Sequence, residues 1–220
     1  MANRRVIGAH TPVEGPEWLS PSAVPGPLVK VRVMDQDLVV RVQQGDQRAF
    51  ETLTVADYPR LFRVANGILG DRYLAEDATQ QAFLDIWRDI RRLKDPAKFE
   101  GWSYRLLVHV CYAEVKRRPD SSLVRWAPPD HEPRAVDTFS AVEDREQLDR
   151  GFRHLSMDHR VVLVLHYLLG MTPEQVAETL GTSRWTVYSR LDRAVKAMRT
   201  ALEADARRGP ASRVPQEVLR

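Results

Sequence analysis

The sequence MTPEQVAETLGTSRWTVYSRLDRAVKAM, residues 171–198, predicts two helices separated by a very short turn. Thr172, Pro173 and Gln175 fit a capping box with proline in the first helical turn, so a helix is expected to begin here. Gly181 supplies the left-handed residue that commonly ends a helix, and the polar residues after it can cap a second one. The stretch therefore predicts a helix-turn-helix.

The second helix of this pair has one apolar side and one polar side. At ~100° per residue, the apolar side collects Val187, Leu191, Ala194 and Met198. The opposite side collects Trp185, Ser189, Asp192, Arg193 and Lys196. One face is thus expected to pack, while the other stays free for solvent or a partner.

Candidate DNA contacts crowd the free side and the first turn of this helix. Cations outnumber the single acid, Asp192, between residues 184 and 199. A solvated basic face would explain this charge, but not the pair Trp185 and Tyr188 close to the helix start, where such a helix meets base edges. We therefore predict a DNA-recognition helix. Its expected contacts are Arg184, Trp185, Thr186, Tyr188, Ser189, Arg190, Arg193 and Lys196.

The composition of the 220-residue chain suits two small domains with apolar cores, because 43% of the residues are hydrophobic. The net charge is only +3, so the positions of the cations are more informative than their excess. Cys111 is the sole cysteine, which excludes an internal disulfide and fits a reducing compartment. The sequence has no long apolar run and no apolar signal segment, so we expect a cytoplasmic protein without membrane insertion.

Proline positions and helical periodicity divide the chain into five segments. Residues 1–36 have no apolar period and are expected to form a flexible tail. Residues 37–118 are expected to form a four-helix domain, and residues 119–140 an extended linker. Residues 141–208 are expected to form the domain that contains the helix-turn-helix, followed by a flexible tail at 209–220. The predicted fold is all-α, with two small helical domains.

The clearest helix of the first domain is expected from Leu74 to about Leu93. Its apolar stripe consists of Leu74, Ala78, Ala82, Ile86 and Ile90, at four-residue steps. A loop from Lys94 to Gly101 and a last helix from Trp102 to Arg118 are expected to follow.

An enzyme and a dimeric helix-turn-helix regulator are the alternative functions. The six histidines include no His-Glu-x-x-His pair, and the chain has neither a phosphate-binding glycine loop nor a Gly-x-Ser-x-Gly elbow. Cys111 lies on an apolar helix, where a buried side chain is more common than a nucleophile. We therefore expect no catalytic residue, no metal and no cofactor. The regulator stays open as an alternative.

Together these motifs resemble the extracytoplasmic-function, or group IV, sigma factors of bacterial RNA polymerase. In the first domain the resemblance rests on Gly45-Asp46, on Ala75-Glu76-Asp77-Ala78 and on Trp102-Ser103-Tyr104-Arg105. In the second it rests on Ser189-Arg190-Leu191 and Arg193-Ala194. A helix-turn-helix alone would also suit a response regulator, so the upstream motifs make the combination specific.

The resemblance implies that the first domain binds core RNA polymerase and opens the minus-10 promoter element, and that the second reads the minus-35 element. The implied polymerase-binding residues are Glu76, Asp77, Gln80, Gln81 and Asp85. The implied contacts to the minus-10 strand are Lys98, Arg105, His109, Lys116 and Arg117, with Arg118 as a further cation. Phe99 and Trp102 are expected to be core residues that shape the loop, with stacking platforms for an unpaired base as the alternative.

The implied partners are core RNA polymerase, double-stranded minus-35 DNA and single-stranded minus-10 DNA. An anti-sigma factor is allowed for, and the free protein is expected to be a monomer. A polymerase-independent regulator would instead bind DNA as a dimer and would not bind core RNA polymerase. The promoter sequence, the target genes, the inducing signal, the role of the N-terminal tail and a translation start at Met34 are left open by the sequence.

Overall fold

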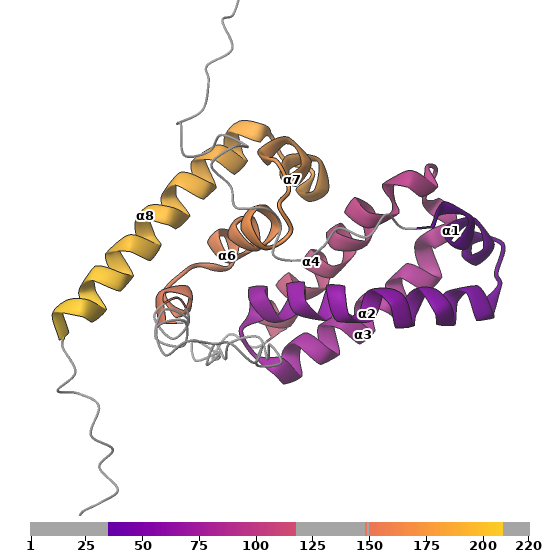
Figure 1. The fold of residues 1–220 in the computed structure, drawn as a ribbon, viewed down its shortest axis with the longest axis horizontal. Helices are drawn as coiled ribbons and strands as arrows, with labels where there is room; N and C mark the ends of the chain where they lie inside the picture. Colours follow the sequence, from indigo (N-terminus) through magenta and orange to yellow (C-terminus); the bar gives the residue numbers. More distant parts are fainter. Residues whose placement is uncertain (1–34, 118–147, 149, 209–220) are drawn as a thin grey trace, which may run out of the picture.

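The computed structural model describes residues 35–117, 148 and 150–208, and the regular elements in these residues are all helical (Figure 1). A first unit contains α1 (Gln36–Gln43), α2 (Gln47–Leu69), α3 (Arg72–Asp89), η2 (Ile90–Arg92), η3 (Pro96–Lys98) and α4 (Phe99–Arg117). A second unit contains α6 (Met157–Leu163), η4 (Val164–Leu168), α7 (Pro173–Leu180) and α8 (Arg184–Arg208). The all-α prediction is confirmed. Arg118, the linker at 119–140 and most of both tails lie outside the described residues.

Aspartates begin the helices of the first unit. Asp46 Oδ1 accepts from the Ala49 amide at 3.0 Å, and Asp71 Oδ1 accepts from the Leu74 amide at 2.9 Å. The Ala49 amide, helped by Arg41, holds the pKa of Asp46 below its usual value. Gly70, at φ 68°, ends α2 in the left-handed conformation that glycine adopts without strain. Local capping chemistry therefore sets the turns between the first helices.

The core of the first unit forms where α3 packs between α2 and α4. The expected stripe on α3 is buried along its whole length, from Leu74 to Ile90. Two boundaries differ from the prediction. The α-helix ends at Asp89, and a 3₁₀ turn carries the chain to Arg92. The next helix starts at Phe99, which is fully buried, so part of the expected loop is already helical.

The helix-turn-helix of the second unit forms as the sequence predicts. Thr172 and Gln175 make both hydrogen bonds of a capping box, and Gly181 ends α7 at φ 63°. Ser183, rather than Thr182, caps α8 by accepting from the Thr186 amide at 3.1 Å. The predicted apolar side of α8 faces the core, with Val187, Leu191 and Ala194 fully buried and Met198 partly so.

The helix before the helix-turn-helix departs from a regular α-helix. The sequence predicts one apolar helix from Ser156 to Leu169, and Ser156 caps it as expected. The second half is a π-helical turn, η4, in which the Leu169 amide donates to the Val164 carbonyl at 3.3 Å. Apolar periodicity does not distinguish four-residue from five-residue hydrogen bonding, so this turn was not foreseen.

The two units pack directly against each other, which the sequence analysis did not predict. A Cβ on Gly67 of α2 would lie 3.1 Å from Val164 Cγ2 in η4, so the two backbones approach closely at this glycine. Arg160 Nη1 donates to the carbonyls of Ile68 and Leu69 at 3.4 and 3.5 Å. Figure 1 shows the second unit, in orange and yellow, lying beside the first, with α7 next to α4.

A buried ion cluster ties α2 to the start of α4. Arg60 is only 8% exposed; its Nη2 donates to Asp57 Oδ2 at 2.9 Å and its Nη1 to Glu100. The guanidinium carbon also lies 4.9 Å from the centre of the Tyr104 ring. A buried charge pair gives little net stability over apolar packing, but the loss of one partner is costly. This cluster therefore makes the α4 start dependent on Arg60.

We expect Arg60→Met to lower the free energy of unfolding by about 3 kcal/mol, because the guanidinium is removed from two acids in a largely dry site. Chemical denaturation with a measured midpoint and slope gives this value. Arg41→Ala is the matched control, since Arg41 pairs with Asp46 on the surface and should cost less than about 1 kcal/mol. Equal losses for the two variants would contradict the assignment.

Candidate nucleic-acid interface

The first turn of α8 presents an exposed aromatic ring beside a cation. Trp185 is 55% exposed, and the Arg184 guanidinium lies 5.8 Å from the centre of its ring. Tyr188 is only partly exposed, and its hydroxyl donates to Glu174 Oε1 at 3.2 Å. The expectation that both aromatic side chains are exposed therefore holds for Trp185 and only partly for Tyr188. Trp185 is available to a partner, whereas Tyr188 also links α8 to α7.

Further along α8, neighbouring side chains hold the cations in place. Arg193 Nη2 donates to Ser189 Oγ at 2.5 Å, and Lys196 Nζ pairs with Asp192 Oδ2 at 2.8 Å. Arg193 and Lys196 are exposed. These bonds join residues one turn apart and cost little to exchange for a phosphate, because exposed pairs of this kind contribute about 0.3–0.5 kcal/mol.

A groove of about 740 Å³ runs between α8 and the start of α6. From α8 it is lined by Trp185, Thr186, Ser189, Arg190 and Arg193, so five of the predicted DNA contacts share one surface. From α6 it is lined by Ser156, Met157, Asp158 and His159, which the sequence analysis missed. Asp158 Oδ2 pairs with Arg190 Nη2 at 3.0 Å. Only the packing of α6 on α8 could reveal this second wall.

The cations predicted for the minus-10 strand do not form one cluster. Lys98, at the end of η3, and Arg105, in the first half of α4, both lie beside α7. Lys116 and Arg117 lie exposed at the other end of α4, where Arg117 pairs with Glu114. His109 is exposed between the two groups. Arg105 and Lys116 are eleven residues apart on α4, and at ~1.5 Å per residue the two groups are about 16 Å apart along the helix.

The start of α4 borders a cleft of about 530 Å³ between the two units. Lys98 lines it from the end of η3, Trp102 and Arg105 line it from α4, and Met171 and Glu178 line it from the second unit. Phe99 is fully buried and its ring centre lies 6.1 Å from that of Trp102, which is partly exposed. Phe99 thus anchors the core as expected, while Trp102 also reaches the cleft.

The acidic face of α3 is continuous but contains an apolar side chain. Asp77, Gln80 and Gln81 are exposed, and Leu84 beside them is 63% exposed. Gln81 Nε2 donates to Asp85 Oδ1 at 3.1 Å. Asp85 also pairs with Arg88 at 2.9 Å, and Glu76 pairs with Arg72 at 3.1 Å. Leu84 was not among the predicted contacts, and it lines one shallow surface pocket together with Asp77, Gln80 and Gln81.

The reactive side chains outside these surfaces are buried or dispersed. Cys111 is fully buried, which raises the pKa of its thiol to about 12. His166 is buried and its Nδ1 lies 2.7 Å from the Met171 carbonyl oxygen. Within residues 35–117 and 150–208 no three His, Cys, Asp or Glu side chains gather as metal ligands would. The described helices also include none with the length and apolar character that a membrane span requires.

Known proteins match both units of this chain. Residues 54–119 match the family described as Sigma-70 region 2, and residues 145–198 match Sigma-70, region 4. The RNA polymerase sigma-H factor of Pseudomonas aeruginosa is 27% identical over 181 residues, covering 77% of this chain and 94% of that protein. The ECF RNA polymerase sigma-E factor of Escherichia coli is 28% identical over 191 residues, covering 80% and 98%.

Two solved structures share the fold. CnrH, in complex with the cytosolic domain of CnrY, matches with a TM-score of 0.55 and 24% identity, covering 78% of this chain and 98% of that one. The sigma factor RpoE, in complex with the anti-sigma factor NepR from Bartonella quintana, matches with a TM-score of 0.56 and 19% identity, covering 71% and 98%. Since both sigma-70 regions match and the sigma-factor relatives are covered over nearly their whole length, the chain belongs to the extracytoplasmic-function sigma factors of the sigma-70 family.

Proposed function

We propose that this protein binds core RNA polymerase, reads the minus-35 element with α8, captures one strand of the minus-10 element along α4, and thereby promotes promoter opening. The observation that carries the proposal is the groove beside α8, where an exposed Trp185 and several cations meet on a chain with both sigma-70 regions. The protein is an initiation factor, and the polymerising chemistry belongs to the polymerase.

Minus-35 reading is supported by the geometry of the α8 start. Arg184 and Trp185 project from the first turn, which is the part of a recognition helix that reaches base edges. Arg193 and Lys196 lie two turns further along and fit phosphate contacts, which position a protein without reading sequence. The two groups therefore have separable roles.

Minus-10 capture is supported by the cations at both ends of α4. Extruding a base costs a few kcal/mol, and a protein offsets this cost with a pocket for the base and cations for the phosphates. Lys98 and Arg105 border the cleft at one end, and Lys116 and Arg117 are exposed at the other. An extended strand laid along α4 would meet both groups, with His109 between them.

Polymerase binding is assigned to the exposed face of α3. Its acids and amides suit a basic surface, and Leu84 offers an apolar anchor at the centre of that face. The solved relatives are complexes with CnrY and with the anti-sigma factor NepR. We propose that an anti-sigma factor is a further partner of this chain. We also take the protein to act in the cytoplasm and to be monomeric when free.

We expect Asp77→Lys combined with Asp85→Lys to weaken core polymerase binding by about 10-fold or more, since both changes reverse charge on the proposed contact face. Affinity is measured by titrating labelled protein with core enzyme. Glu51→Lys combined with Glu203→Lys makes the same total charge change at exposed sites on α2 and α8 and should leave affinity near wild type. Equal affinities for the two double variants would exclude α3 as the contact.

A second prediction separates base reading from phosphate contact on α8. Arg184→Ala should change which minus-35 base is preferred, removing about 1–3 kcal/mol of discrimination if the arginine contacts a guanine. Lys196→Ala should weaken all sites alike and reduce the salt dependence. The measurement uses promoters selected by reconstituted transcription with core polymerase, a panel of single-base minus-35 variants, and two salt concentrations.

A uniform loss across the panel for Arg184→Ala would reduce that residue to a phosphate contact. Binding of promoter DNA by a dimer, with no association with core polymerase, would instead favour a polymerase-independent regulator and sink the proposed function.

A further inference from the structure

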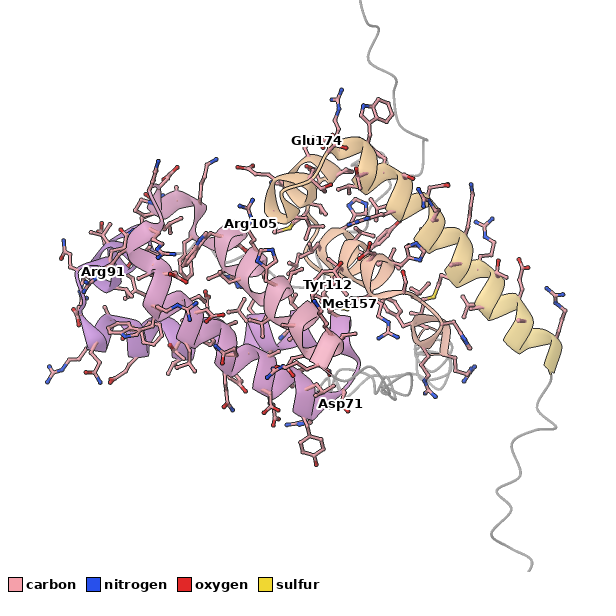
Figure 2. The ribbon with its side chains drawn as sticks, turned by 180° about the vertical axis from the view of Figure 1, so that it is seen from behind. Asp71, Arg91, Arg105, Tyr112, Met157 and Glu174 are labelled. Carbon is pink, nitrogen blue, oxygen red and sulfur yellow. The ribbon has the colours of Figure 1, made fainter. Side chains whose placement is uncertain are left out.

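The C-terminal end of α7 is capped by a side chain from the other unit. Arg105 Nε donates to the Thr179 carbonyl at 2.7 Å, and Arg105 Nη2 donates to the Glu178 carbonyl. The last carbonyls of a helix lack partners within it and carry the negative end of the helix dipole. Arg105 satisfies two of them from α4 (Figure 2).

A second cation binds the same helix end through its side chain. Lys98 Nζ lies 2.7 Å from Glu178 Oε1, and each group favours the charged form of the other, which raises the pKa of Lys98 and lowers that of Glu178. Both side chains are exposed, so this pair is weak by itself and open to competition.

The end of α7 thus offers one carboxylate and two carbonyl oxygens to an ammonium and a guanidinium. A phosphodiester offers the same cations a comparable set of negatively charged acceptors, and a guanidinium binds phosphate oxygens in a fork. We infer that α7 occupies the place of a nucleic-acid backbone. Docking of α7 on Lys98 and Arg105, and capture of single-stranded DNA by the same two residues, therefore exclude each other. The inference rests on the proposed function, which assigns these two cations to the minus-10 strand.

Contacts elsewhere in the interface hold α7 in position. The Tyr112 hydroxyl donates to Asp158 Oδ1 at 2.5 Å, and Gly67 packs on Val164. In Figure 2, Arg105 and Tyr112 lie on the same α4 helix, and Met157, next to Asp158 in the sequence, lies close to Tyr112. A strand that binds Lys98 and Arg105 must therefore displace α7 against this packing, and the closed form lowers the affinity of the free protein for single strands.

The coupling is reciprocal by thermodynamic necessity. If docking of α7 weakens strand binding by some factor, strand binding weakens docking by the same factor. A change in the distance between the units therefore reports strand capture directly, without polymerase and without a known promoter.

The test uses the full chain with dyes on cysteines placed at Val55 and Arg199, one exposed position in each unit. The native Cys111 is buried and should not react in the folded protein. Energy transfer between the dyes is measured alone and during titration with a short single-stranded oligonucleotide of randomised sequence. Glu178→Lys is compared with Glu203→Lys, which makes the same charge change on α8, away from α4.

We expect the single strand to lengthen the distance in the wild type, and Glu178→Lys to lengthen it without DNA. Glu178→Lys should also raise single-strand affinity by about 5-fold or more relative to Glu203→Lys, the lower end of ordinary coupling between sites. Adding Lys98→Ala to Glu178→Lys should remove most of this gain, because the gain passes through Lys98.

An unchanged distance in Glu178→Lys, together with wild-type strand affinity, would overturn the inference. A longer distance without any gain in affinity would also overturn it, since α7 would then not compete with the strand. Failure of the proposed function is visible separately, as an absence of core-dependent transcription in a protein whose distance and strand affinity still respond as expected.

Discussion

The arrangement of this molecule depends on how the carbonyls at the end of α7 find donors. The turn supplies two backbone donors: the Gly181 amide donates to the Glu178 carbonyl at 3.3 Å and the Thr182 amide to the Ala177 carbonyl at 3.0 Å. Arg105, from α4, donates to the Thr179 carbonyl and is a second donor to the Glu178 carbonyl. Many helices are capped by residues next to them in the sequence, whereas the end of α7 is capped partly by Arg105 of the other unit. The backbone of α7 therefore helps to position one unit on the other.

Arg105 can cap α7 because α4 packs into the first unit on one side and contacts the second unit on another. Tyr104, Leu107 and Cys111 are buried in the first unit, whereas Arg105 and Tyr112 lie two turns apart on a side that reaches the second unit. A residue spacing of seven returns a side chain to nearly the same helix face. One helix therefore supplies core packing, candidate strand contacts and the contact with the second unit. Arg105 belongs to both of the last two groups.

Much of this molecule follows from local sequence chemistry. The capping box at Thr172, the left-handed Gly181 and the four-residue stripe of α3 set their elements without help from the rest of the chain. The groove wall at Asp158 and the docking of α7 depend on residues far apart in sequence. No periodic pattern encodes such pairings. The cationic residues were predicted, but their existing intramolecular partners were not.

Asp158 shows what such pairings add to the function. Its two carboxylate oxygens bind Tyr112 of α4 and Arg190 of α8, so one side chain joins the contact between the units to the wall of the α8 groove. If the units separate as proposed, Asp158 loses the hydrogen bond from the Tyr112 hydroxyl and keeps only its ion pair with Arg190. Arg190, on the proposed minus-35 surface, is thereby linked through Asp158 to the interface that covers Lys98 and Arg105, the cations proposed for the minus-10 strand. In the proposed separation of the units, the movement that exposes Lys98 and Arg105 therefore also frees one carboxylate oxygen of Asp158 beside the α8 groove.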